Sequence, residues 1–189
     1  MKSRLIQISL LLLIILSAEI FAGENQTRYL NGYINNVDDN LISLTNNLVL
    51  RADRHITSVS MTPVTIILSK DRNEGYLYLR NEKVNVTLMQ RTSGGMWAPA
   101  MNDALTSYNV GDLYNIDNIN LKNGVVILSN GDAWKTKLDE DKEELEKWSP
   151  NTEVLVINNG NTIKIKNVIT SESINVIKKT DLASDKSAN

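Results

Sequence analysis

The 189-residue chain contains no cysteine, a single histidine and a single phenylalanine. The lack of cysteine excludes disulfide frameworks, thiolate metal sites and cysteine nucleophiles. One histidine excludes a multi-histidine metal site within one chain. The formal net charge is only −2, so we expect no nucleic-acid partner and no binding to an anionic membrane surface. We therefore predict a protein without a metal or other cofactor.

The N-terminus has the three-part pattern of a secretory signal peptide. Lys2 and Arg4 precede an apolar run at 5–16, and Ala22 supplies a small residue for cleavage. The run covers about twelve residues, fewer than the roughly 20 that a membrane-spanning helix needs. This favours cleavage over the alternative of an uncleaved membrane anchor. Export without cysteine points to a bacterial envelope protein, periplasmic or secreted, with no stable transmembrane span after cleavage.

The rest of the chain shows the period-two alternation of β-strands. Residues 76–80 and 162–166 alternate as half-buried strands do, and residues 64–68 and 153–157 indicate more fully buried strands. Frequent turn signals make an all-β fold of small barrel-like or sandwich-like units the leading architecture. Four Asn-Gly pairs, which favour tight hairpin turns, stand at 31–32, 123–124, 130–131 and 159–160.

The two halves of the chain follow the same order of elements. Segments 34–51 and 116–135 align with Leu50 at the position of Trp134, and each is followed by a polar stretch and three more strands. This predicts two tandem copies of one β unit of about 60 residues; the alternative is that any meandering β chain resembles itself. The predicted organisation is a signal peptide at 1–22, a first β unit at 24–90, a linker with a possible short helix at 91–112, a second β unit at 113–180 and a disordered tail at 181–189.

The second unit has an insertion at 139–148 with the pattern of a short helix. Acidic residues come first, and Glu143 and Lys147 are spaced for a favourable i,i+4 pair. Leu145 and Trp148 share one face of this helix, so we expect them to close an open end of the second unit.

Residues 125–135 together with 147–156 carry an aliphatic strand, a turn ending near Trp134, the later Trp148 with a following turn, and a Val-rich strand. This pattern resembles a repeat found in exported β proteins of chlamydiae and other host-associated bacteria, whose function is uncharacterised. The resemblance covers roughly the mature chain and implies export and an internal repeat. It carries over no catalytic residue.

Candidate catalytic and metal-binding residues are few. His55 lies beside Asp53 and near Ser58, but no nucleophile elbow accompanies them, so we interpret His55 as a polar loop residue. The acidic cluster at 139–144 lacks the central glycine and ligand spacing of a calcium loop and is better explained as a solvated helix face. We therefore predict no catalytic, cofactor-binding or metal-binding residue.

The tryptophans are the remaining candidates for ligand or interdomain contacts. Trp134 and Trp148 are interpreted mainly as core residues of the second unit, with stacking on a sugar or peptide as the alternative. Trp97, in the segment between the units, is the better candidate for an exposed or interdomain contact.

Two classes of function remain. The favoured hypothesis is a non-catalytic exported interaction module, in which two β units present strand edges or loops to a protein or glycan partner. The alternative is a small periplasmic glycan-binding domain or hydrolase that uses Trp97, Trp134 and carboxylates.

Overall fold

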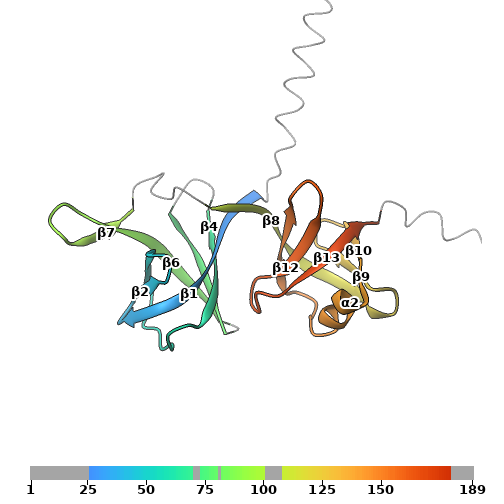
Figure 1. Ribbon diagram of the computed structural model, residues 1–189, viewed down its shortest axis with the longest axis horizontal. Helices are drawn as coiled ribbons and strands as arrows, with labels where there is room; N and C mark the ends of the chain where they lie inside the picture. The colour runs from blue at the N-terminus through green and yellow to red at the C-terminus, as the bar shows by residue number, and fades with distance from the viewer. Residues whose placement is uncertain (1–25, 70–72, 81, 101–107, 180–189) are drawn as a thin grey trace, which may run out of the picture.

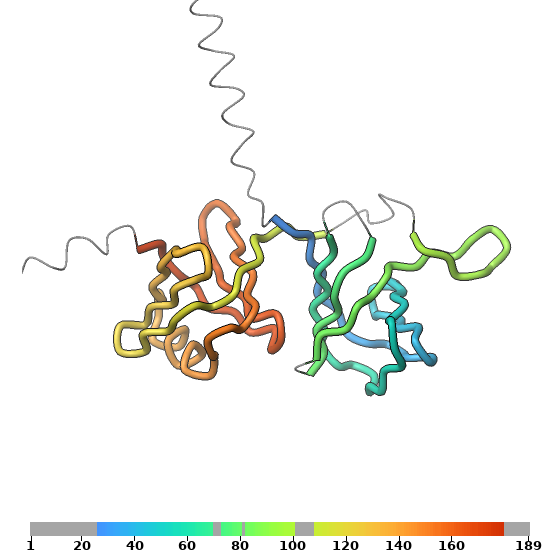
Figure 2. Tube along the Cα trace, turned by 180° about the vertical axis from the view of Figure 1, so that it is seen from behind, coloured from blue at the N-terminus to red at the C-terminus, as the bar shows by residue number. Residues whose placement is uncertain are grey.

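The computed structural model describes residues 26–69, 73–80, 82–100 and 108–179. The predicted signal peptide, the helical turn expected around 101–105 and the C-terminal tail lie outside the described residues. The chain forms an all-β structure in which two closed six-stranded barrels lie side by side (Figures 1 and 2). We call them the first and the second barrel.

The first barrel closes because its first and fourth strands pair with each other. Around the barrel the order is β1-β2-β3-β6-β5-β4. Because β4 pairs with β1 and not with β3, the connection at 53–62 crosses one end of the barrel. The strands are β1 (Gln26–Asp38), β2 (Leu41–Leu44), β3 (Val49–Ala52), β4 (Pro63–Leu68), β5 (Glu74–Leu79) and β6 (Glu82–Arg91). A short strand, β7 (Trp97–Pro99), extends β6 into a hairpin outside the barrel.

The second barrel closes in the same way, through pairing of β11 with β8. Its order is β8-β9-β10-β13-β12-β11. Helix α2 (Asp139–Leu145) lies in the connection between β10 and β11, as predicted for the second unit. The other elements are β8 (Asn109–Asn120), the 3-10 helix η1 (Leu121–Asn123), β9 (Val125–Leu128), β10 (Ala133–Thr136), β11 (Glu153–Asn158), β12 (Ile163–Asn167) and β13 (Ser173–Lys178).

The two barrels agree in backbone detail as well as in strand order. Both long first strands shift register at a bulge, after Ile34 in β1 and after Ile116 in β8. Leu50 and Trp134 take the same place, paired with the middle of the neighbouring strand. This agrees with the expected alignment of the halves; that both arose from one repeated unit stays a prediction. Matching backbone hydrogen bonds run from Thr45 to Tyr33 and Ser129 to Asn115, from Met61 to Ile34 and Asn151 to Ile116, and from Asp53 to Asn85 and Lys137 to Asn175.

Each barrel holds its own apolar core, closed at one end by the crossing connection. In the first barrel Ile56 reaches from that connection into a core of aliphatic side chains. In the second barrel Leu145 and Trp148 do the same, as expected, and pack with Trp134. Asp141, only 6% exposed, accepts hydrogen bonds from the backbone and side-chain nitrogens of Asn175 and so ties α2 to β13.

The barrels are joined by an antiparallel pairing of their first strands. Residues 26–29 of β1 pair with residues 109–112 of β8. When the bulges at Ile34 and Ile116 are aligned, Arg28 and Val110 are equivalent positions, and these two residues pair with each other. The barrels are thus related by an approximate two-fold axis at this pair.

Side chains from both barrels fill the junction. A separate apolar cluster combines Tyr29, Ile67 and Tyr78 of the first barrel with Leu155 and Val168 of the second. Polar contacts surround this cluster. They are Tyr78 Oη to Glu153 Oε2 at 2.9 Å, Lys83 Nζ to Glu153 Oε1 at 2.7 Å, Lys166 Nζ to Asn31 Oδ1 at 2.9 Å and Thr65 Oγ1 to Ser171 Oγ at 2.9 Å.

Three sequence expectations differ from the structure. The Asn31-Gly32 pair is not a turn but lies inside β1, where both residues pair with β4; the other three Asn-Gly pairs lie between strands as expected. The segment 91–112 is not only a linker, because it contains β7 and the start of β8. Lys147 forms its ion pair with Glu144 at 2.6 Å, one residue later than expected.

Candidate functional site

The outer face of the first barrel carries two rows of polar side chains. Because alternate residues of a strand point to the same face, Arg51 of β3, Thr87 of β6 and Glu74 of β5 form one row across three paired strands. The next row is formed by Asp53, Asn85 and Tyr76. The Asn85 amide donates to Asp53 Oδ2 at 2.5 Å, which fixes both side chains.

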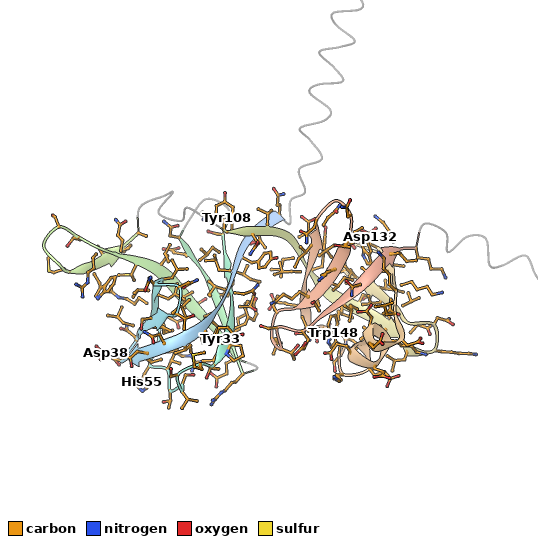
Figure 3. The ribbon with its side chains drawn as sticks, viewed as in Figure 1. Tyr33, Asp38, His55, Tyr108, Asp132 and Trp148 are labelled. Atoms are coloured by element: carbon orange, nitrogen blue, oxygen red, sulfur yellow. The ribbon has the colours of Figure 1, made fainter. Side chains whose placement is uncertain are left out.

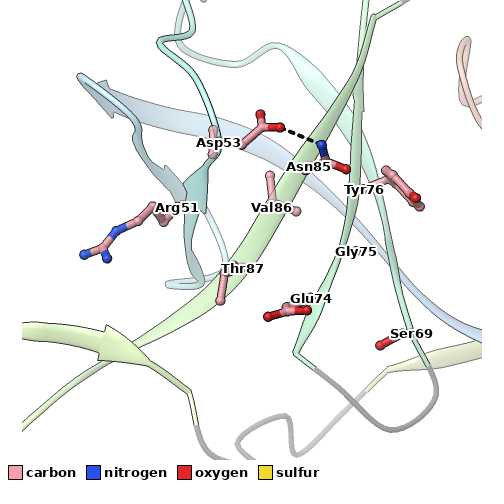
Figure 4. A pocket seen from close by; sticks show the side chains of 10 residues that line it. Arg51, Asp53, Ser69, Glu74, Gly75, Tyr76, Asn85, Val86 and Thr87 are labelled. Carbon is pink, nitrogen blue, oxygen red and sulfur yellow. Dashed lines mark hydrogen bonds between the residues drawn. The ribbon is translucent and has the colours of Figure 1, made fainter.

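A hollow of about 510 Å³ lies along these rows (Figure 4). Gly75 and the buried Ala52 and Val86 line it together with the polar side chains. Tyr76, 40% exposed, stands at one side, and the Lys83 ammonium lies 4.1 Å from its ring centroid. A cation this close to a ring attracts it electrostatically, so Lys83 holds the Tyr76 ring in place beside the hollow.

The β6–β7 hairpin is the second candidate surface. It extends from the first barrel on the side away from the second barrel (Figures 1 and 2). Gly95, at φ +79°, closes its turn, with hydrogen bonds from Gly95 N to Thr92 O and from Thr92 N to Met96 O. Met96 is 72% exposed, and the Arg91 guanidinium lies 5.2 Å from the Trp97 ring centroid. The hairpin is therefore pre-formed and exposes the apolar side chain of Met96 beside a polar, glycine-rich turn.

The structure places the three candidate tryptophans in two different settings. Trp134 and Trp148 are each 6% exposed and belong to the core of the second barrel. Trp148 Nε1 donates to Glu144 Oε1 at 3.1 Å, whereas Trp134 Nε1 is buried without a hydrogen-bond partner among the described residues. Trp97 is partly buried on the hairpin, which carries it away from the second barrel. A ligand contact through Trp97 stays a prediction.

His55 lies in the connection across the end of the first barrel (Figure 3). The same view shows Trp148 in the second barrel, so the two residues belong to different barrels. The His55 side chain is 68% exposed, with Nδ1 3.2 Å from Asp39 Oδ1. It lines a smaller hollow of about 270 Å³ with Arg54 and Arg80. Arg54 is already paired with Glu82 at 2.6 Å. Thr57 also lines this hollow, but among the described residues no hydrogen bond joins its hydroxyl to His55.

The sequence alone does not predict the polar rows. In the sequence, Asp53 stands out only as a neighbour of His55, and residue 76 only as part of an alternating strand. The available signal was the alternation at 74–79 and 82–88, whose outward positions are polar or aromatic. Which outward positions meet across strands depends on the register of β3, β6 and β5, and the sequence does not specify this register.

No known family model, curated protein or solved structure matches this chain. Within the described part of the chain, no group of three or more His, Cys, Asp or Glu side chains is arranged to hold a metal ion. The same residues include no helix long and apolar enough to cross a membrane. The candidate surfaces are therefore characterised by their own geometry alone.

Proposed function

We propose that the protein is an exported, non-catalytic interaction module of a bacterial envelope, and that the β6–β7 hairpin contacts its protein or glycan partner. The observation that carries this proposal is the hairpin itself. It is held by a tight turn, extends beyond the barrel and exposes Met96 more than any other large apolar side chain among the described residues. A pre-formed element loses little conformational entropy on binding.

The pairing of β7 supports the same role. Within the described residues, β7 pairs only with β6, whereas every strand of the two closed barrels has neighbours on both sides. An unpaired strand edge offers backbone donors and acceptors to a partner. The resemblance to exported chlamydial β repeats and the signal peptide pattern support export; both remain proposals.

Site-specific photo-crosslinking in native envelopes tests the interaction. A photoreactive residue replaces Met96 in one variant and Met61, 61% exposed in the connection of the first barrel, in the matched control. We expect a specific adduct from position 96 and none from position 61. Equal adducts at both positions, or none at position 96, would contradict a role of the hairpin.

The mass of the intact protein purified from envelopes tests export. We expect residues 1–22 to be absent. A dominant species that retains Met1 would contradict cleavage.

A further inference from the structure

The aromatic ring and the glycine that line the hollow of the first barrel have no counterpart in the second barrel, although the two barrels share one strand order. The matching strand pairs place Lys135 of β10 at the position of Arg51, and Ile163 and Lys164 of β12 at those of Gly75 and Tyr76. The second barrel thus has neither the aromatic ring nor the glycine at this place. The polar and aromatic set of the first barrel is not required to close a barrel of this kind.

The chemistry of the hollow limits what it can bind. The strands beneath it are paired on both sides, so their ladder hydrogen bonds are already made and recognition falls to side chains. The side chains that line the hollow carry charges of both signs, the guanidinium of Arg51 and the carboxylates of Asp53 and Glu74. The two carboxylates disfavour an anionic ligand, and the guanidinium weakens the attraction of the carboxylates for a cationic one.

The side chains offer hydrogen-bond donors and acceptors in close alternation. Arg51 and Asn85 supply N–H groups, Asp53 and Glu74 supply carboxylate oxygens, and the Thr87 hydroxyl does both. A ligand rich in hydroxyl groups can satisfy such a set, because each hydroxyl both donates and accepts. The exposed part of the Tyr76 ring adds an apolar surface against which the C–H face of a sugar ring can pack.

We propose that this hollow is a binding site for a neutral oligosaccharide, with Tyr76 as the stacking platform and Arg51, Asp53 and Glu74 as the hydroxyl-binding groups. This site is separate from the hairpin of the proposed function, and neither proposal depends on the other. The second barrel has no equivalent of Tyr76 or Gly75, so within the described residues we place this site on the first barrel and not on the second.

Calorimetric titration of the full mature chain tests the proposal. The neutral probes are cellotriose, maltotriose and the N-acetylglucosamine trimer, each to about 10 mM; the comparison probes are trigalacturonate and a neutral Gly-Ser hexapeptide. We expect at least one neutral trisaccharide to bind with a Kd of about 1 mM or tighter. Tyr76→Ala and Arg51→Ala should weaken this binding about tenfold or more, and Tyr76→Phe should retain it because the ring remains.

Lys164→Ala and Lys135→Ala, at the matching positions of the second barrel, are the controls and should bind as the wild type does. Because Arg51 and Tyr76 are exposed, we expect the variants to keep the native fold. Circular dichroism on every variant checks this. Absence of binding to all three neutral sugars overturns the proposal, as does binding only to trigalacturonate or the peptide. Equal losses in the first-barrel variants and their controls would also overturn it. The sugar titrations do not test the hairpin. Their outcome therefore does not decide whether the hairpin contacts a partner, which the crosslinking experiment tests.

Discussion

The hydroxyl of Tyr78 in the first barrel donates a 2.9 Å hydrogen bond to Glu153 in the second, and Lys166 in the second barrel returns a 2.9 Å hydrogen bond to Asn31 in the first. Tyr78 pairs with Thr65, and Lys166 pairs with Leu155 at the matching place of the second barrel. Equivalent positions therefore reach across the junction in opposite directions. The two donors follow the approximate two-fold axis, whereas the acceptors do not, because Glu153 matches Pro63 and Asn31 matches Leu113.

Replacing Tyr78 with Phe should destabilise the junction. Glu153 would keep Lys83 as a partner but lose the hydroxyl, and we expect the free energy of unfolding at pH 7 to fall by about 1–2 kcal/mol. Burial, followed by the charge of Glu153, raises the pKa of Tyr78 above its ordinary value. The unfolded tyrosine ionises near pH 10, so the stability of the wild type should fall as the pH rises above that value.

Urea denaturation between pH 7 and 11 measures both effects. Tyr78→Phe should lack part of the alkaline decline, whereas Tyr33→Phe, at a residue that is 49% exposed, should match the wild type throughout. An unchanged stability of Tyr78→Phe at pH 7 would show that the hydroxyl does not strengthen the junction.

Lys166 should give the opposite pH dependence. Burial lowers its pKa, and the nearby Glu172 opposes this only in part. Between the lowered pKa and about 10.4, the ordinary value for lysine, the unfolded chain binds the proton more tightly, so stability should rise with pH. Lys166→Met should remove this rise of stability with pH. At pH 7 it should change the free energy of unfolding by less than about 1.5 kcal/mol, because the loss of the hydrogen bond to Asn31 is offset by removal of a buried charge.

The control is Lys164→Met, two residues earlier on β12 and more exposed than Lys166. Its curve should follow that of the wild type. If Lys166→Met keeps the full rise of stability with pH, the rise has another source.

The strands and the helix were the parts of the fold that local sequence patterns could predict. Residues 64–68 and 153–157 form the buried strands β4 and β11, and the helix begins at Asp139 as expected. These elements depend on alternation and charge placement within a few residues. The alignment of Leu50 with Trp134 also followed from the pattern of the flanking strands.

What depended on distant pairing was not predictable. The Asn31-Gly32 pair has the local signal of a turn, but pairing with Thr65 and Val64 keeps it extended within β1. The junction and the hollow depend on the register of strands far apart in the chain. The sequence pattern therefore indicated the type of barrel and did not indicate which side chains share a surface.

Asp141 should be needed for the second barrel. It is buried on α2 and accepts hydrogen bonds of 2.9 and 3.2 Å from Asn175, so Asp141→Ala leaves a partly buried backbone N–H without its partner. We expect thermal or urea denaturation to show a loss of about 1–3 kcal/mol. Asp139→Ala, at the exposed first residue of the same helix, should lose less than about 1 kcal/mol, from the helix dipole alone. Equal losses in the two variants would contradict an anchoring role of Asp141.

His55 should be dispensable. Its side chain is 68% exposed and its contact is with the exposed Asp39, and exposed ion pairs contribute about 0–1 kcal/mol. His55→Ala should therefore retain the wild-type melting temperature within a few degrees and give the same crosslinked adduct from position 96. Loss of the adduct in a folded His55→Ala variant would reveal a functional role for the histidine.

Gly75 and Gly32 form a matched pair of strand glycines with opposite expectations. A Cβ at Gly75 would overlap the carbonyl oxygen of Ile67 and lie 2.8 Å from Leu68 Cα, so β4 and β5 must separate to admit it. A Cβ at Gly32 would meet Leu44 Cδ1 at 3.5 Å, an ordinary contact. Gly75→Ala should lower the free energy of unfolding by about 3 kcal/mol or more. Gly32→Ala should leave it unchanged or raise it by up to about 1 kcal/mol, because alanine restricts the unfolded chain. Urea denaturation of both variants decides the matter, with soluble yield as the readout if Gly75→Ala does not fold; a Gly75→Ala protein as stable as Gly32→Ala would mean that β4 does not approach β5 so closely.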